Sequence, residues 1–410
     1  MKRILAVFAI TRILLLLAVA APDVVPPCER FRVAIEGPPG AFEDQVVPWS
    51  KSATGQRYNL TEFRPLDAFT HMDARYYLSI AAFSYRTNAD GSVPREAGFF
   101  PLYPLIVRSV AGTIEMVVGW VSPPTPRSTE VWLVAAWLVS NGALLLAALA
   151  LMRFAEGIGQ GDWGLLAATA LLVSPVSFFG SAMLSESLFL FLSIECLRRA
   201  NRREFVFAAC LGGAAAMTRA IGVALVVPLL VSSFERRSDR RESIGDACTF
   251  SLVPTGAAVI PAWHGIALGA PFAYAEVQSL FGHGRFPEIE GFLTLLKLFG
   301  QTPLDTARNA VQLAALAAAV LGLWITWREA QRGALPWSIP VWGASSLAIP
   351  LLSGHIISLP RYVFAVFPVW IGLGILFSRL AARGWWFAVP SMALQIVGLL
   401  IFAKAWPILI

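Results

Sequence analysis

Runs of mostly apolar residues recur along nearly the whole chain, and short polar segments separate them. The longer runs contain about 17 to 25 residues, the length that an α-helix needs to cross a hydrocarbon core about 30 Å thick. We therefore expect an all-α polytopic membrane protein with about 11–13 membrane helices. The expected membrane segments are 4–25, 99–120, 131–152, 165–179, 184–197, 205–216, 221–234, 244–268, 304–327, 337–352, 362–377 and 385–405.

One long polar segment, residues 26–98, interrupts this pattern. Its first half is rich in proline and glycine, whereas residues 65–85 have the amphipathic spacing of a helix that lies flat on a membrane surface. At about 100° per residue, Asp73 lies inside the apolar stripe of this expected helix, and His71 and Arg75 lie opposite. The stripe consists of Phe69, Met72, Tyr76, Ile80 and Phe83. A carboxylate on that face has to be paired, solvated in a cavity or used in chemistry.

The first apolar segment, 4–25, follows Lys2 and Arg3. A cleaved signal peptide begins in the same way. Because the apolar run is long, we expect an uncleaved anchor. Arg12 lies within this segment, where a charge needs a buried partner or a polar cavity.

Composition agrees with a membrane protein, since 57% of the residues are hydrophobic and 14% are charged, against about 25% charged in ordinary soluble domains. The net charge of +6 comes from short basic clusters that adjoin the ends of apolar runs. Such scattered clusters argue against nucleic-acid binding and are typical of cytoplasmic loops. They are Lys2–Arg3, Arg198–Arg199 with Arg202–Arg203, Arg236–Arg237 with Arg240–Arg241, Arg328 with Arg332, and Arg379 with Arg383.

If these clusters are cytoplasmic, the long loop 26–98 lies outside. Its basic residues do not argue against this location, because loops beyond about 60 residues are translocated whatever their charge. The number of segments between 99 and 197 then has the wrong parity, so one of them is expected to be re-entrant. Irregular backbone at membrane depth is tolerated where protein or water surrounds it, so this region is expected to line a site. Residues 99–120 and the short runs that follow are the candidates for the re-entrant segment.

Ionisable residues gather on the expected outer side, and each either marks the end of a span or takes part in a site. Asp73 is suited to deprotonate an acceptor hydroxyl for displacement at a sugar anomeric carbon. Arg219, His355 and Arg361 are suited to hold a phosphate. The outer set is Asp73, Arg75, Glu186, Arg219, His283, Arg285, His355 and Arg361.

No nucleotide-binding, zinc-protease or serine-nucleophile motif occurs in the sequence. The four cysteines offer neither a disulfide framework nor the spacing of metal ligands. The sequence therefore indicates no required cofactor, and a divalent metal has no support from it.

The segment His71-Met72-Asp73-Ala74-Arg75-Tyr76-Tyr77-Leu78-Ser79-Ile80-Ala81, followed by Phe99-Phe100-Pro101-Leu102-Tyr103-Pro104, resembles the PIG-V-like mannosyltransferases. These are relatives of the second mannosyltransferase of GPI-anchor synthesis, within the integral-membrane GT-C glycosyltransferases. Met72 departs from the family pattern, which usually has tryptophan there. Weaker matches follow in Ser174–Pro175 with Ser185–Phe189, in Thr218–Arg219 with Gly222, and in Pro360–Tyr362 before Phe367–Pro368.

The resemblance implies a GT-C fold and an inverting transfer of mannose, or another hexose, from a polyprenyl- or dolichyl-phosphate donor to a lipid-linked or glycan acceptor. By that analogy Asp73 is the base, Glu186 contacts acceptor or sugar, and Arg219 and Arg361 meet the donor phosphate. The expected substrate-binding residues are His71, Arg75, Tyr76, Tyr103, Glu186, Arg219, His355 and Arg361.

Two other functions compete with this interpretation. Charges within spans and broken helices also occur in transporters or flippases for lipid-linked sugars, although no internal repeat is found. A non-catalytic subunit of a glycosylation complex is the second alternative, and its activity would survive the loss of Asp73. We expect one membrane domain over 1–410 in a prokaryotic plasma membrane, with its site on the outer, extracytoplasmic face; in a eukaryote the expected membrane is that of the ER.

Overall fold

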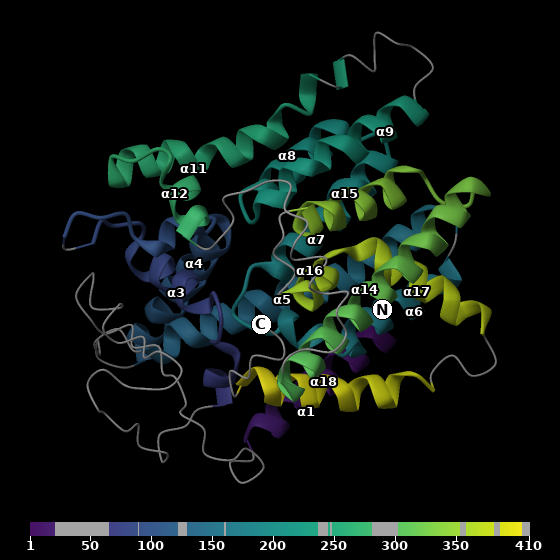
Figure 1. Cartoon of the computed structure of the whole chain (residues 1–410), viewed down its shortest axis with the longest axis horizontal. Coiled ribbons are helices and arrows are strands. Elements are labelled where there is room, and N and C mark those ends of the chain that lie inside the picture. Colours follow the sequence, from purple (N-terminus) through teal and green to yellow (C-terminus); the bar gives the residue numbers. More distant parts are fainter. Residues whose placement is uncertain are drawn as a thin grey trace.

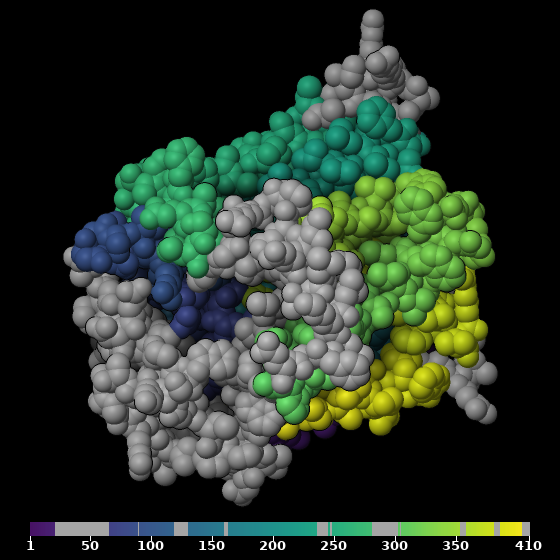
Figure 2. All heavy atoms as spheres, in the orientation of Figure 1, coloured from purple at the N-terminus to yellow at the C-terminus, as the bar shows by residue number. Residues whose placement is uncertain are grey.

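The computed structural model describes residues 1–20, 65–88, 90–121, 129–159, 161–236, 245–246, 248–280, 302–352, 358–380 and 386–403. Every regular element in these ranges is a helix, which confirms the all-α class. The helices form a bundle in which α1 (Lys2–Ala20) and α18 (Ala388–Ala403) lie along one edge and α8 (Phe205–Ala216) and α11 (Leu252–Leu268) along the opposite edge (Figure 1; Figure 2 shows the same face as spheres).

The remaining α-helices are α3 (Ala74–Phe83), α4 (Leu102–Val121), α5 (Thr129–Gly157), α6 (Gly161–Val173), α7 (Glu186–Asn201), α9 (Val226–Arg236), α12 (Ala273–Leu280), α14 (Pro303–Gln331), α15 (Ser338–Leu352), α16 (Leu359–Ala365) and α17 (Phe367–Arg379). The short 3-10 helices are η3 (Pro65–Phe69), η4 (Arg95–Gly98), η5 (Ser177–Gly180) and η6 (Ala220–Leu225).

Two helix pairs approach so closely that only glycine fits between them. A Cβ on Gly256 of α11 would lie 2.1 Å from the carbonyl oxygen of Gly213 in α8. In the same way, a Cβ on Gly372 of α17 would lie 2.0 Å from the carbonyl oxygen of Gly322 in α14. Small residues at a crossing allow backbones to pack closely, which is how helices associate where lipid removes the hydrophobic driving force.

The chain is an integral membrane protein. In the described ranges α1, α5 and α14 are long and apolar enough to cross a membrane singly, and up to 5 spans result if the bent pairs α11–α12 and α16–α17 are each counted as one. These pairs bend by 97° and 76°. Shorter apolar helices, among them α8, α15 and α18, coincide with other segments that we expected among the about 11–13.

Neither bent pair lies between residues 99 and 197, where a re-entrant segment was expected. That expectation stays a prediction. The bend between α11 and α12 has a local cause, because α11 is capped by Gly269, whose left-handed φ of +66° ends the right-handed helix.

The surface helix expected over 65–85 is wrong in its extent. The structure has η3 at Pro65–Phe69 and then α3, which begins at Ala74. Met72 separates them because its φ of 62° is left-handed and cannot continue a right-handed helix. Asp73 is consequently the N-cap residue of α3 rather than a member of a helical stripe.

Candidate active site

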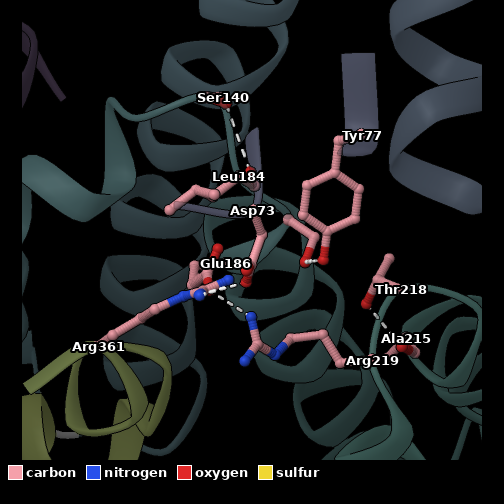
Figure 3. A network of polar contacts seen from close by, with 10 residues as sticks. Asp73, Tyr77, Ser140, Leu184, Glu186, Ala215, Thr218, Arg219 and Arg361 are labelled. Carbon is pink, nitrogen blue, oxygen red and sulfur yellow. Dashed lines mark hydrogen bonds and ion pairs between the residues drawn. The ribbon is translucent and has the colours of Figure 1, made fainter. Parts of the chain in front are cut away.

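Four charged side chains from distant parts of the chain meet beside α3 (Figure 3). Asp73 precedes α3, Glu186 is the first residue of α7, Arg219 precedes η6, and Arg361 lies in α16. In Figure 3 the two arginine side chains point toward the two carboxylates from two sides. We call Asp73, Glu186, Arg219 and Arg361 the charge cluster.

Three ion pairs link these residues into a chain. The Nη1 of Arg361 donates to Oδ2 of Asp73, and its Nε donates to Oε1 of Glu186. The same Oε1 accepts from Nη1 of Arg219. Two carboxylates and two guanidinium groups thus balance in charge, which a site of low dielectric constant requires of buried ions.

The two carboxylates differ in accessibility. The side chain of Glu186 is 0% exposed, whereas that of Asp73 is 29% exposed. Oε2 of Glu186 has no hydrogen-bond partner among the described residues, although it is buried. Asp73 is therefore the carboxylate that an entering substrate can reach, and Glu186 has one acceptor oxygen left to offer.

Local backbone structure aims Asp73 and Glu186 at the arginines. Asp73 occupies an N-cap position, yet its side chain makes no capping hydrogen bond and turns to Arg361 instead. Glu186 begins α7, and the positive end of a helix dipole favours a carboxylate there. Ser185 just before it shares a 2.9 Å hydrogen bond with the hydroxyl of Tyr77 in α3. This hydrogen bond connects the two segments of the chain that carry Asp73 and Glu186.

Arg219 is placed by a tight connection between α8 and η6. Its backbone is extended, and Gly222 packs so closely that a Cβ there would lie 2.5 Å from the backbone nitrogen of Ala216. The guanidinium lies 5.9 Å from the ring centroid of Tyr362. This tight connection therefore requires a glycine at position 222, three residues after Arg219.

Aromatic rings join α3 to the first turn of α4 and to the segment before it. Tyr76 stacks on Phe99 with 4.6 Å between ring centroids, and Tyr77 lies edge-on to both Phe99 and Tyr103 at 5.4 and 5.3 Å. The Tyr103 hydroxyl reaches Ser140 of α5 at 2.8 Å. The two sequence motifs thus form one packed unit, which adjoins the charge cluster through the hydrogen bond between Tyr77 and Ser185.

Other residues expected at the site have different described partners. His71 lies edge-on to Phe402 of α18 at 5.6 Å, and burial lowers the pKa of His71 to about 4, against a backbone hydrogen bond with Ala403 that raises it. Arg75 covers the ring of Tyr76 at 4.6 Å and donates to its hydroxyl. His355 lies outside the described residues, as do His283 and Arg285. Their expected roles stay predictions.

The sequence did not identify Tyr77 and Ser185 as members of the site, nor Ser140, which bonds to the hydroxyl of Tyr103. A polar residue in the apolar run of α5 was the available signal for Ser140, because such residues often hydrogen-bond across membrane helices. No group of three or more metal-ligating side chains occurs in the described ranges.

No protein-family model matches the chain, and no curated protein does. The chain is similar in structure to the oligosaccharyltransferase AglB of Archaeoglobus fulgidus in complex with an inhibitory peptide and a dolichol-phosphate, with a TM-score of 0.45 and 14% identity over 82% of this chain and 51% of that one. It is also similar to ArnT of Cupriavidus metallidurans bound to undecaprenyl phosphate, with a TM-score of 0.43 and 14% identity over 82% and 71%.

A further structure of the Archaeoglobus enzyme, a complex with Zn and sulfate, gives a TM-score of 0.43 and 13% identity over 84% of this chain. The chain spans about half the length of these oligosaccharyltransferases, 48% of the chain in that complex. Likenesses this distant assign no activity to the present chain.

Proposed function

We propose that the protein is a GT-C glycosyltransferase that transfers a hexose from a polyprenyl- or dolichyl-phosphate donor at the outer face of the membrane. The hexose that we propose first is mannose. The acceptor is a hydroxyl of a lipid-linked sugar or glycan. One observation carries this proposal: the partly exposed carboxylate of Asp73 pairs with the buried guanidinium of Arg361, which Glu186 connects to a second guanidinium, that of Arg219. The resemblance of residues 71–81 and 99–104 to PIG-V-like mannosyltransferases supports the same reaction.

In this reaction Asp73 accepts the proton of the acceptor hydroxyl as its oxygen bonds to the anomeric carbon of the sugar. The bond between that carbon and the phosphate oxygen breaks, and the electron pair leaves with the lipid phosphate. One displacement of this kind inverts the anomeric configuration. The developing charge on the phosphate needs cationic donors fixed in advance, because preorganised charges stabilise a transition state without reorganising.

Arg219 and Arg361 are suited to that task, since guanidinium groups bind phosphate through several N–H donors at once. Without donor, their charges are balanced by Asp73 and Glu186. A phosphate at Arg361 would compete with Asp73 for its N–H groups and so free the carboxylate to act as a base. Binding of the donor phosphate to Arg361 would thereby also activate Asp73 as the base.

Glu186 has a different role because it is fully buried and holds both arginines through one oxygen. It orients the two guanidinium groups toward the donor. Its second oxygen lacks a partner among the described residues and is suited to accept a hydrogen bond from a sugar hydroxyl. A polar oxygen that is buried without a partner is costly, and binding of a hydroxyl would relieve that cost.

The test uses the purified chain in liposomes with polyprenyl-phosphate mannose labelled in the sugar and a membrane lipid extract as acceptor. We expect label to enter a new glycolipid whose anomeric configuration is opposite to that of the donor. A flippase would move labelled lipid between leaflets without forming a glycosidic bond. Absence of any labelled product with mannose, glucose or other hexose donors contradicts the proposed function.

A further inference from the structure

The charged residue inside the first membrane helix has a defined set of partners. Arg12 of α1 is 4% exposed. Its Nη1 donates to the Ser181 hydroxyl at 2.6 Å, its Nη2 to the carbonyl oxygen of Leu172 at 3.1 Å, and its Nε to the Thr11 hydroxyl at 3.3 Å. With the amide of Gln395 oriented so that its oxygen faces donors, that oxygen also accepts from Nη2 at 3.1 Å. One guanidinium thus connects α1, α6, α18 and the turn that follows η5.

These partners are neutral, and Arg12 forms no ion pair with any described residue. Leu172 lies in the last turn of α6, where carbonyl groups have no intrahelical partner and the helix dipole favours a cation. The charge is therefore tolerated because the end of α6 and three further oxygens solvate it. With four of its five N–H donors occupied, the guanidinium connects structural elements rather than forming a ligand site.

The turn held by Arg12 leads directly into the charge cluster. The Ser181 hydroxyl, which accepts from Arg12, donates in turn to Oδ1 of Asn141 in α5 at 2.8 Å. The N–H of Met183 donates to the carbonyl oxygen of Phe69 at 3.0 Å. Ser185 bonds to Tyr77 at the other end of the turn. Residues 181–185 are thus fixed at their start and end, and Glu186 follows as the next residue.

From this arrangement we propose that Arg12 is a positioning residue for sugar transfer. Through Ser181 it fixes the turn 181–185, and the turn sets the direction in which the carboxylate of Glu186 meets Arg219 and Arg361. The inference rests on the proposed function for its kinetic consequence, although the fixing of the turn is a property of the fold itself. It also accounts for a charge in a membrane helix that packing alone does not require.

Arg12→Gln removes the charge and most of the donors. We expect kcat to fall by about 10- to 100-fold, the range that a small misplacement of a catalytic group produces. Arg12→Lys, which can still reach one oxygen, should recover part of the loss. Arg198→Gln is the matched control, because Arg198 is a buried arginine at the other end of α7 whose described partner is Glu195. It should leave kcat per folded molecule unchanged.

A double-mutant cycle separates positioning from general structural damage. If Arg12 acts through Glu186, Arg12→Gln lowers kcat much less in a Glu186→Gln background than in the wild type. Where that background turns over too slowly, the Kd for a short polyprenyl phosphate replaces kcat as the readout. Equal losses in both backgrounds would overturn the proposal. If Arg12→Gln does not fold, Ser181→Ala breaks the same connection at its next atom and takes its place in the cycle.

Hydrogen exchange provides a readout that does not depend on activity. Amides of residues 181–187 should exchange faster in Arg12→Gln than in the wild type, whereas Arg198→Gln should leave them unchanged. Unchanged exchange in Arg12→Gln contradicts the fixing of the turn. If the wild type transfers no sugar while exchange rises as expected, the proposed function fails and the fixing of the turn by Arg12 stands.

Discussion

Arg361 bridges the two carboxylates of the charge cluster. Its replacement by glutamine therefore removes the ion pair of Asp73 and leaves Glu186 paired with Arg219 alone. Removing one partner of a buried ion pair costs about 3–5 kcal/mol of unfolding free energy. Here Glu186 keeps Arg219, and Asp73 is 29% exposed to solvent. We therefore expect Arg361→Gln to lower stability by about 3 kcal/mol, at the low end of that range.

The cycle of Arg361→Gln, Glu186→Gln and the double variant measures this coupling by denaturant unfolding in detergent. The double variant should be more stable than the sum of the single losses implies, by about 1–3 kcal/mol, because each single change leaves the other charge uncompensated. Arg332→Gln is the control, since Arg332 is 56% exposed in its pair with Glu329, and such pairs contribute about 0–1 kcal/mol. Additive losses at Arg361 and Glu186 would refute the buried ion pairs.

Three further changes test the surroundings of the cluster. Gly222→Ala forces a Cβ to within 2.5 Å of Ala216, so Arg219 should shift and the KM for donor should rise by about 10-fold or more in a transfer assay. Tyr77→Phe removes the hydrogen bond to Ser185 and should lower the thermal midpoint by the equivalent of about 1 kcal/mol. Because the pKa of His71 falls from 6.5 to about 4 on burial, the unfolded chain binds more protons between these values. Wild-type stability should therefore drop as pH falls through that window, and less so in His71→Gln, as denaturant titrations at each pH will show.

The sequence indicated which residues lie on one side of the membrane but not which of them meet. Alternation of apolar runs and basic clusters placed Asp73, Glu186, Arg219 and Arg361 among the outer residues, and the structure brings these four together. The family resemblance placed His71 among the substrate-binding residues, and in the structure its ring lies against Phe402 of α18. Which helix end lies next to which depends on packing between segments that are hundreds of residues apart, and no local pattern encodes that packing.

Helical periodicity gave a wrong prediction around Met72, where the backbone is not helical. The stripe drawn through Phe69, Met72 and Tyr76 assumed a continuous helix, and the left-handed conformation of Met72 interrupts it. Arg12 was recognisable as unusual, since a charge in a membrane helix needs partners. Its partners Ser181, Leu172 and Gln395 come from three other elements and became visible only in the fold.

The central claim is that Asp73 takes the proton from the acceptor. Single-turnover transfer from saturating polyprenyl-phosphate mannose, comparing wild type with Asp73→Asn, tests it most directly. Asp90→Asn is the matched control, because Asp90 is an exposed residue of the same loop and its side chain accepts from the backbone of Ser92. We predict that Asp73→Asn binds donor at least as tightly as the wild type, because no carboxylate then competes with the phosphate for Arg361, and that it loses about 100-fold or more in turnover, while Asp90→Asn does not. Equal turnover in wild type and Asp73→Asn would contradict the claim.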